Sequence, residues 1–126
     1  MTISLESQGI TITLKRILEL LEGEDEDDYG IIKPTDYAFK TVLNLVSEAY
    51  YLMGSSFPRA SASCDDEGGI SLDWTSIETE RQVSLFCPFS ADKRTYIYHE
   101  TSEEYAVDYV VCASNLADWL QWFSGE

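Results

Sequence analysis

The sequence predicts an α+β fold with two N-terminal helices, a four- to five-stranded antiparallel meander sheet and one C-terminal helix. Apolar residues recur at helical spacing before residue 54 and again after residue 113, whereas apolar and polar residues alternate in short segments between them. Clusters of Gly, Pro, Asp and Ser separate those segments and favour turns. The length of 126 residues fits a single α+β domain over 1–126, in which we expect residues 1–10 to be flexible.

The first helix is predicted over residues 12–22. The apolar residues that recur there at helical spacing are Leu14, Ile17, Leu18 and Leu21. Ile10 and Ile12 alternate with polar residues, which would suit a strand, so the helix is not extended before residue 12.

The second helix is predicted to begin around Pro34 and Thr35 and to end at Gly54. Pro suits the first turn of a helix, Thr can cap the free N–H groups, and Gly is common just past a helix end. The apolar stripe of this helix consists of Phe39, Val42, Leu43, Val46, Ala49, Tyr50 and Met53. Leu45 and Leu52 widen the stripe, so we expect the helix to pack against two neighbours.

The second half of the chain is predicted to form the sheet. Strands are expected over 60–64, 70–75, 81–87 and 94–100. Residues 65–69 have the composition of a hairpin turn, and Pro88 ends the third strand. Residues 105–112 suit a fifth strand or a helix, and both alternatives stay open.

The last helix is predicted after a cap at Ser114 or Asn115. Its inner face is expected to carry Leu116, Trp119, Leu120 and Phe123. Trp122 falls at the edge of that stripe, and Gly125 ends the helix.

The chain is strongly acidic, with 23 Asp and Glu against 8 Lys and Arg and a formal net charge of -15. No Lys or Arg follows Arg94. Such a charge repels nucleic-acid phosphates and anionic lipid, so we expect neither nucleic acid nor a membrane as partner. It attracts a basic protein surface, although solubility alone would also explain it.

The predicted location is the cytoplasm. The sequence shows no secretory signal pattern, and no apolar run approaches the roughly 20 residues of a membrane span. Cys64, Cys87 and Cys112 match no disulfide framework, and each falls in a strand-like stretch. We therefore expect buried free thiols in a reducing compartment.

The middle of the chain resembles a family of small uncharacterised bacterial proteins, many of them cyanobacterial. The matching residues, within 14–86, are Gly30, Pro34, Thr35, Pro58, Asp66, Gly68, Gly69, Ile70, Leu72 and Trp74. The hairpin of the family has the pattern Asp-x-x-Gly-Gly-Ile-x-Leu-x-Trp, which residues 65–74 follow. The resemblance implies the fold and no established activity, and it assigns no functional residue. The chain departs from the family in its acidic loop, where relatives often place a Trp and this chain has residues 25–29.

A calcium-binding loop is one alternative for the acidic segment. Asp25, Asp27, Gly30 and Asp36 fall at positions 1, 3, 6 and 12 of the calcium-loop template. Tyr29 occupies position 5, where it supplies no good ligand, and a solvated acidic loop explains the same residues. We therefore expect no cofactor, with calcium as the alternative.

Aromatic residues gather in the last predicted strands. Tyr96, Tyr98, Tyr105 and Tyr109, together with Trp122, are the candidate partner-binding residues. Tyr is frequent in strands and is also enriched at interfaces, so packing inside the fold is the competing explanation. The predicted function is a binding module for a basic protein, as an inhibitor, an antitoxin-like partner or an accessory subunit. A DNA mimic and a homodimer are alternatives.

No enzymatic activity is predicted. The chain has no glycine-rich phosphate loop, nucleophile elbow or metalloprotease helix. His99 is its single histidine, and Cys87 would have to lie beside it to form a nucleophilic pair. No local signature supports that pair or a zinc site.

Overall fold

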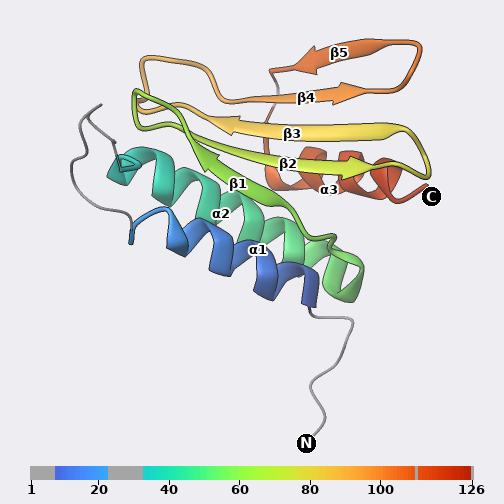
Figure 1. Cartoon of the computed structure of the whole chain (residues 1–126), viewed down its shortest axis with the longest axis horizontal. Coiled ribbons are helices and arrows are strands. Elements are labelled where there is room, and N and C mark those ends of the chain that lie inside the picture. The colour runs from blue at the N-terminus through green and yellow to red at the C-terminus, as the bar shows by residue number, and fades with distance from the viewer. Residues whose placement is uncertain (1–7, 23–32, 110, 126) are drawn as a thin grey trace, which may run out of the picture.

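The computed structural model describes residues 8–22, 33–109 and 111–125 and confirms the predicted α+β fold (Figure 1). Within those ranges it contains two N-terminal α-helices, a five-stranded antiparallel sheet and a C-terminal α-helix. The elements in chain order are α1 (Gln8–Glu19), α2 (Asp36–Met53), the short 3-10 helix η2 (Gly54–Ser56), β1 (Ser61–Cys64), β2 (Ile70–Ser76), β3 (Arg81–Cys87), β4 (Tyr96–Glu100), β5 (Tyr105–Asp108) and α3 (Ala113–Phe123).

The strands lie in the order β1-β2-β3-β4-β5, so each pairs with its neighbours in sequence. This is the predicted meander, with five strands. In the register, Asp73 of β2 lies opposite Ser84 of β3, and Ser84 lies opposite Tyr98 of β4. Directly paired residues point to the same face of a sheet, so these three side chains are aligned across its middle.

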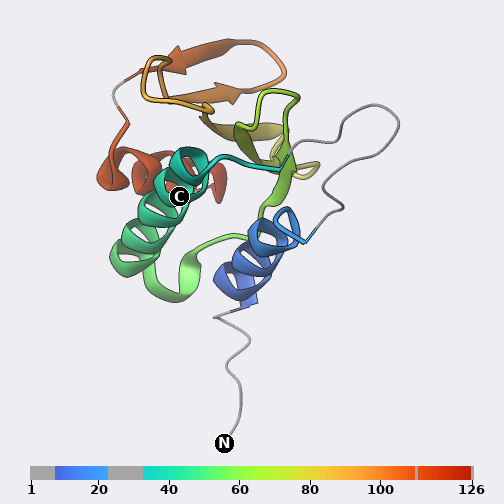
Figure 2. The same ribbon diagram turned by 90° about the vertical axis from the view of Figure 1, so that its left-hand side faces the viewer.

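One face of the sheet carries the core. Helices α2 and α3 cover this face, and α1 packs beside β1 on the same side (Figure 1, Figure 2). The strand residues with no exposed surface on this face are Ile70, Leu72, Trp74, Val83, Leu85, Cys87 and Ile97. Burial of one large apolar side chain stabilises a fold by roughly 1.5–3 kcal/mol. No described helix or strand covers the opposite face, so the polar alternation of β2 and β3 faces outward.

Helix α2 begins where the sequence predicts and is tied to the sheet at its start. The Thr35 hydroxyl accepts a hydrogen bond from the Ala38 N–H at 3.1 Å and donates one to the Phe89 carbonyl at 2.7 Å. The Thr35 N–H donates to the carbonyl of Gly68 at 3.0 Å. Gly68 has a φ of 98°, and a Cβ there would crowd the Thr35 methyl group. A glycine in the β1–β2 hairpin therefore lets the hairpin close onto α2.

Helix α1 starts at Gln8, four residues before the predicted start at residue 12. Thr13 explains the difference, because this polar residue has no exposed surface and interrupts the apolar pattern. Its hydroxyl donates to the Gly9 carbonyl at 2.7 Å and accepts from the Ala60 N–H at 2.9 Å. A Cβ at Gly9 would collide with the Phe57 carbonyl, so glycine allows this close approach of helix and chain.

The C-terminal elements differ from the prediction in their boundaries. Strand β5 ends at Asp108, and Cys112 is the N-cap of α3 in place of Ser114 or Asn115. Cys112 is thus exposed at a helix start, which corrects the expectation of a buried thiol in a strand. Hydrogen bonds from Ser114 and Asn115 lower the pKa of its thiol.

The other two thiols form no disulfide and are more enclosed. Cys87 is buried, and burial raises the pKa of its thiol to about 12. Cys64 is half-buried, and its burial and the neighbouring Asp65 carboxylate both raise the thiol pKa. Cys87 therefore fits the expectation of a buried thiol, and Cys64 fits it only in part.

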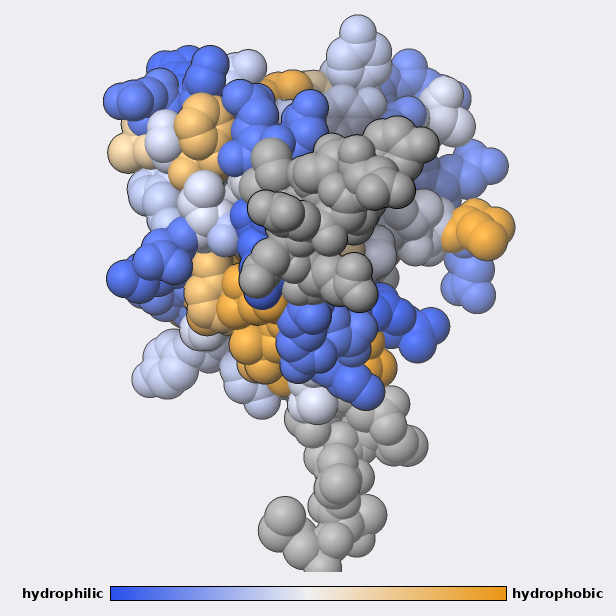
Figure 3. All heavy atoms as spheres, turned by 60° about the vertical axis from the view of Figure 1, so that its left-hand side comes forward, coloured by the Kyte–Doolittle hydropathy of each residue, from blue (hydrophilic) through white to orange (hydrophobic). Residues whose placement is uncertain are grey.

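The described surface is hydrophilic over much of the face seen in Figure 3. A smaller hydrophobic area lies in the lower half of this view. The large apolar side chains exposed on α1 and α2 are Leu18, Tyr37, Tyr51 and Leu52. In the part of the chain that the structure describes, no helix has both the length and the apolar character needed to cross a bilayer.

Candidate functional site

The sheet face turned away from the helices is the candidate site, and we call it the open face. Along its centre lies a hollow of about 450 Å³, the central hollow. Its lining comes from β2, β3, β4 and β5 and the residue after β5: Ser71, Asp73, Ser84, Phe86, Tyr96, Tyr98, Val107 and Tyr109. This size falls within the roughly 300–1,000 Å³ of small-ligand sites.

A carboxylate lies on the floor of the central hollow. Asp73 Oδ1 accepts a hydrogen bond from the Ser84 hydroxyl at 2.6 Å. Its Oδ2 accepts a longer one from the Ser71 hydroxyl at 3.5 Å. The Gln82 side-chain amide donates to Ser84 Oγ at 3.1 Å, so a short chain of hydrogen bonds orients the carboxylate.

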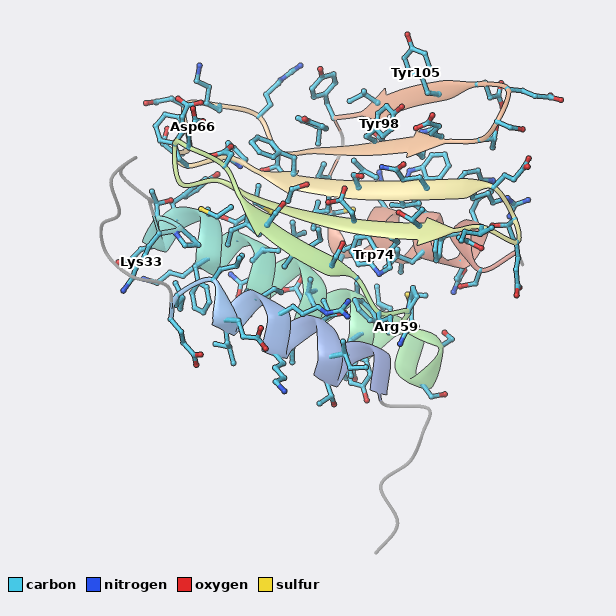
Figure 4. All side chains as sticks on the ribbon, in the orientation of Figure 1. Lys33, Arg59, Asp66, Trp74, Tyr98 and Tyr105 are labelled. Atoms are coloured by element: carbon cyan, nitrogen blue, oxygen red, sulfur yellow. The ribbon has the colours of Figure 1, made fainter. Side chains whose placement is uncertain are left out.

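Aromatic rings form the walls of the central hollow. The Phe86 and Tyr96 rings lie with their centroids 5.2 Å apart, and Tyr109 meets Tyr96 edge-on at 6.1 Å. The ring centroids of Tyr98 and Tyr105 lie 6.1 Å apart. Figure 4 shows the two residues on the adjacent strands β4 and β5. Such centroid distances are typical of aromatic pairs that stabilise one another. The walls are thus held by their own contacts before any partner binds.

The Tyr98 hydroxyl is also fixed. It donates to Glu100 Oε1 at 2.9 Å, and this hydrogen bond raises the pKa of Tyr98. The hydroxyl therefore stays protonated across the physiological range. Glu100 in turn adds a second carboxylate beside the tyrosines.

A second hollow of about 470 Å³, the corner hollow, adjoins the central hollow. The two share Phe86, Tyr96 and Tyr109. Here the Arg94 guanidinium lies over the Tyr109 ring, 4.9 Å from its centroid. The other lining residues of the corner hollow are Glu67, Pro88, Phe89, Asp92 and Lys93. The corner hollow is therefore mixed in charge, whereas the charged group lining the central hollow is a carboxylate.

The structure brings together most of the predicted partner-binding residues. Tyr96, Tyr98 and Tyr109 line the central hollow, and Tyr105 packs on Tyr98 at the β5 edge. Trp122 lies on α3, on the helical side of the sheet. Trp122 and Tyr105 both line a smaller hollow of about 160 Å³ at the β4–β5 hairpin.

Trp122 belongs to a separate aromatic cluster under the sheet. His99 stacks on Trp119 at 3.6 Å, and Trp119 meets Trp122 edge-on at 5.5 Å. The Arg81 guanidinium lies over the Trp122 ring and donates to the Trp122 carbonyl. Burial lowers the pKa of His99, against the opposing effect of the Asp108 and Glu104 carboxylates. These contacts show that Trp122 packs against its neighbours beneath the sheet.

Among the described residues, no side chains are arranged as the cysteine–histidine pair or the metal site would require. In the register, Val83 is the β3 partner of His99, and Cys87 lies four residues further along the strand. Asp25 and Asp27 lie outside the described residues, and Asp36 is exposed at the first position of α2. Within the described ranges, no three His, Cys, Asp or Glu side chains gather as a metal site requires.

Sequence reasoning missed the polar floor and one wall of the central hollow. Asp73, Ser84 and Phe86 all point to the open face because they alternate with buried residues of β2 and β3. That alternation was visible in the sequence. The pairing register, which places these residues beside the tyrosines, was not.

No protein-family model, curated protein or solved structure matches the chain.

Proposed function

We propose that this protein is a binding module without enzymatic activity, which engages a basic protein through the open face of its sheet. The single observation that carries the proposal is the composition of this uncovered face. Four tyrosines and a phenylalanine surround carboxylates there, in a chain with a net charge of -15. Tyrosines of this kind are enriched at interfaces, and opposite charge steers a partner toward the face.

Exposure at the edge of the sheet supports this surface as the contact region. Tyr105 is 73% exposed and Tyr109 is 54% exposed, and Val107 lies between them on the chain. Large aromatic side chains at the surface gain free energy when a partner removes them from water. Their rings are already ordered by ring contacts with Tyr98 and Tyr96, so little rotamer freedom is lost on binding.

The test is recovery of a partner by the tagged full-length chain from its native cells, with washes at low and high salt. We expect a basic protein that is retained at low salt and released as salt screens the charges. The double variant Tyr105→Ala/Tyr109→Ala should reduce retention by about tenfold or more, because a few large aromatic side chains often contribute most of an interface's affinity.

The matched control is Tyr51→Ala/Leu52→Ala, which removes two exposed apolar side chains from the outer surface of α2. This control should retain the partner as the unmodified chain does. Equal retention by both double variants would show that the open face is not the contact surface. Retention that does not respond to salt would contradict the electrostatic part of the proposal.

A further inference from the structure

We infer that the central hollow is an arginine-binding pocket, in which Asp73 receives the guanidinium of the partner's anchoring side chain. This inference rests on the proposed function and names the chemistry of the partner's contact residue. Three features of the open face carry it: the hydrogen-bonding capacity of the Asp73 carboxylate, the aromatic walls of the central hollow, and the contact of the chain's own Arg94 with Tyr109.

Asp73 keeps acceptor capacity toward the hollow. An ionised carboxylate offers about four lone-pair sites. The two serine hydroxyls use one of them at 2.6 Å and one at the longer distance of 3.5 Å. Within the described residues, Asp73 pairs with these hydroxyls and with no Lys or Arg. A guanidinium fork would supply both the missing positive charge and two parallel donors.

The aromatic walls suit a flat cation. Phe86, Tyr96 and Tyr109 stand on one side of the hollow and Tyr98 lines it as well. A guanidinium is attracted to the faces of such rings, and its weaker hydration makes it easier to desolvate than an ammonium. Lysine presents a compact and strongly hydrated charge that cannot form the bidentate pair, so the site favours arginine.

The chain already places one guanidinium on this face. Arg94 lies over the Tyr109 ring at 4.9 Å, on the side that borders the corner hollow. Tyr109 also lines the central hollow, so one of the rings that a bound arginine would contact accepts the same chemical group within the fold. The Arg94 contact shows that the Tyr109 ring accommodates a guanidinium.

The test is an NMR titration of the full-length chain with N-acetyl-arginine amide at neutral pH. The comparison ligands are N-acetyl-lysine amide and N-acetyl-citrulline amide, the latter a neutral analogue of arginine with nearly the same shape. We expect shifts centred on Asp73, Ser84 and Tyr98 that saturate at millimolar arginine. Citrulline should give no saturable shift, and lysine should bind at least about threefold more weakly.

The Asp73→Asn variant should weaken arginine binding by about tenfold or more, because it removes the charge from the pair. Asp118→Asn is the matched control, since it makes the same charge change at an exposed position of α3. Arginine binding by this control should equal that of the unmodified chain. The arginine–citrulline comparison uses the unmodified chain. It therefore tests whether binding requires the guanidinium charge even if Asp73→Asn disturbs the fold.

Equal binding of arginine and citrulline, or of arginine and lysine, would overturn the inference. So would unchanged arginine binding in Asp73→Asn. If the inference fails in this way while Tyr105→Ala/Tyr109→Ala still loses a basic protein, the proposed function stands without an arginine anchor. If arginine binds as expected and no basic protein depends on the tyrosines, the proposed function fails and the pocket remains.

Discussion

His99 shows how one residue can be packed without being part of a reactive site. Its ring stacks on Trp119, and its pKa is lowered because burial outweighs the nearby Asp108 and Glu104 carboxylates. The folded state therefore binds this proton less readily than the unfolded chain, whose pKa is near 6.5.

The sign of the pH effect follows from that difference. Well above pH 6.5 the imidazole is neutral in both states, so it does not change how the free energy of unfolding depends on pH. As pH falls from 6.5 toward the lower folded-state pKa, the unfolded chain takes up the proton first, so the free energy of unfolding decreases. We expect His99→Phe, which keeps an aromatic ring on Trp119, to lack this decrease.

The measurement is urea unfolding of both proteins between pH 7.5 and 5.5, read as the difference between them so that shared carboxylate titrations cancel. NMR titration of the imidazole checks the pKa directly, because the chain has a single histidine. A folded-state pKa above 6.5 would contradict the prediction, because the free energy of unfolding would then increase as pH falls.

At the scale of elements, Thr35 joins three parts of the fold. Its hydroxyl caps α2 through Ala38 and also reaches Phe89 after β3, while its N–H reaches Gly68 in the β1–β2 hairpin. The loss of a helix N-cap alone destabilises a protein by about 0.5–2 kcal/mol. Loss of the second hydrogen bond adds to this, because the Phe89 carbonyl would lose its donor.

We therefore expect Thr35→Ala to lower the free energy of unfolding by about 1.5–3 kcal/mol. Thr35→Ser keeps the hydroxyl and should lower it by less than about 1 kcal/mol. Urea unfolding monitored by circular dichroism measures both. Equal losses for the two variants would assign the effect to the threonine methyl group instead of the cap.

The elements also show where sequence patterns suffice. Strand β3 has the predicted bounds, because alternation starts it and Pro88 ends it. The start of α1 was wrong because Thr13 is polar yet buried, and only the Ala60 N–H across the chain explains why it is there. Local patterns thus predict an element when its residues follow the usual burial, and fail when a distant backbone group satisfies a polar side chain.

The candidate site was predictable only in part. The tyrosines were predicted from their number in the last strands, and three of them do line one hollow. Asp73 is 25 residues away from Tyr98 in the sequence, and the register through Ser84 brings them together. No spacing rule within the sequence reports that register, so the polar floor could not be foreseen.

For the whole molecule, the excess of negative charge has a consequence for stability. A net charge of -15 on a compact domain produces self-repulsion, which the expanded unfolded chain relieves. Added salt screens this repulsion over a Debye length that falls from about 30 Å at 0.01 M to about 10 Å at 0.1 M. We expect the urea midpoint to rise as sodium chloride increases over that range.

A pair of opposite charge changes at exposed turns provides the control. Glu103→Lys reduces the net negative charge and should raise the urea midpoint, whereas Lys93→Glu increases it and should lower the midpoint. Both differences should shrink as salt is added. Midpoints that fall with salt, or that respond equally to both substitutions, would show that local contacts at these turns dominate over the overall charge.

Tryptophan and tyrosine residues lie on different sides of the sheet around the central hollow, so tryptophan fluorescence and tyrosine absorbance report on different parts of the molecule. Trp74, Trp119 and Trp122 all lie on the helical side, whereas the central hollow is lined by tyrosine and phenylalanine rings. Excitation at the red edge of the aromatic absorption band selects tryptophan, so its emission follows the integrity of the core. We expect a molecule bound in the central hollow to change the absorbance of the tyrosines that line it. The domain therefore carries separate intrinsic reporters for unfolding and for occupancy of its open face, and no dye is needed to tell one from the other.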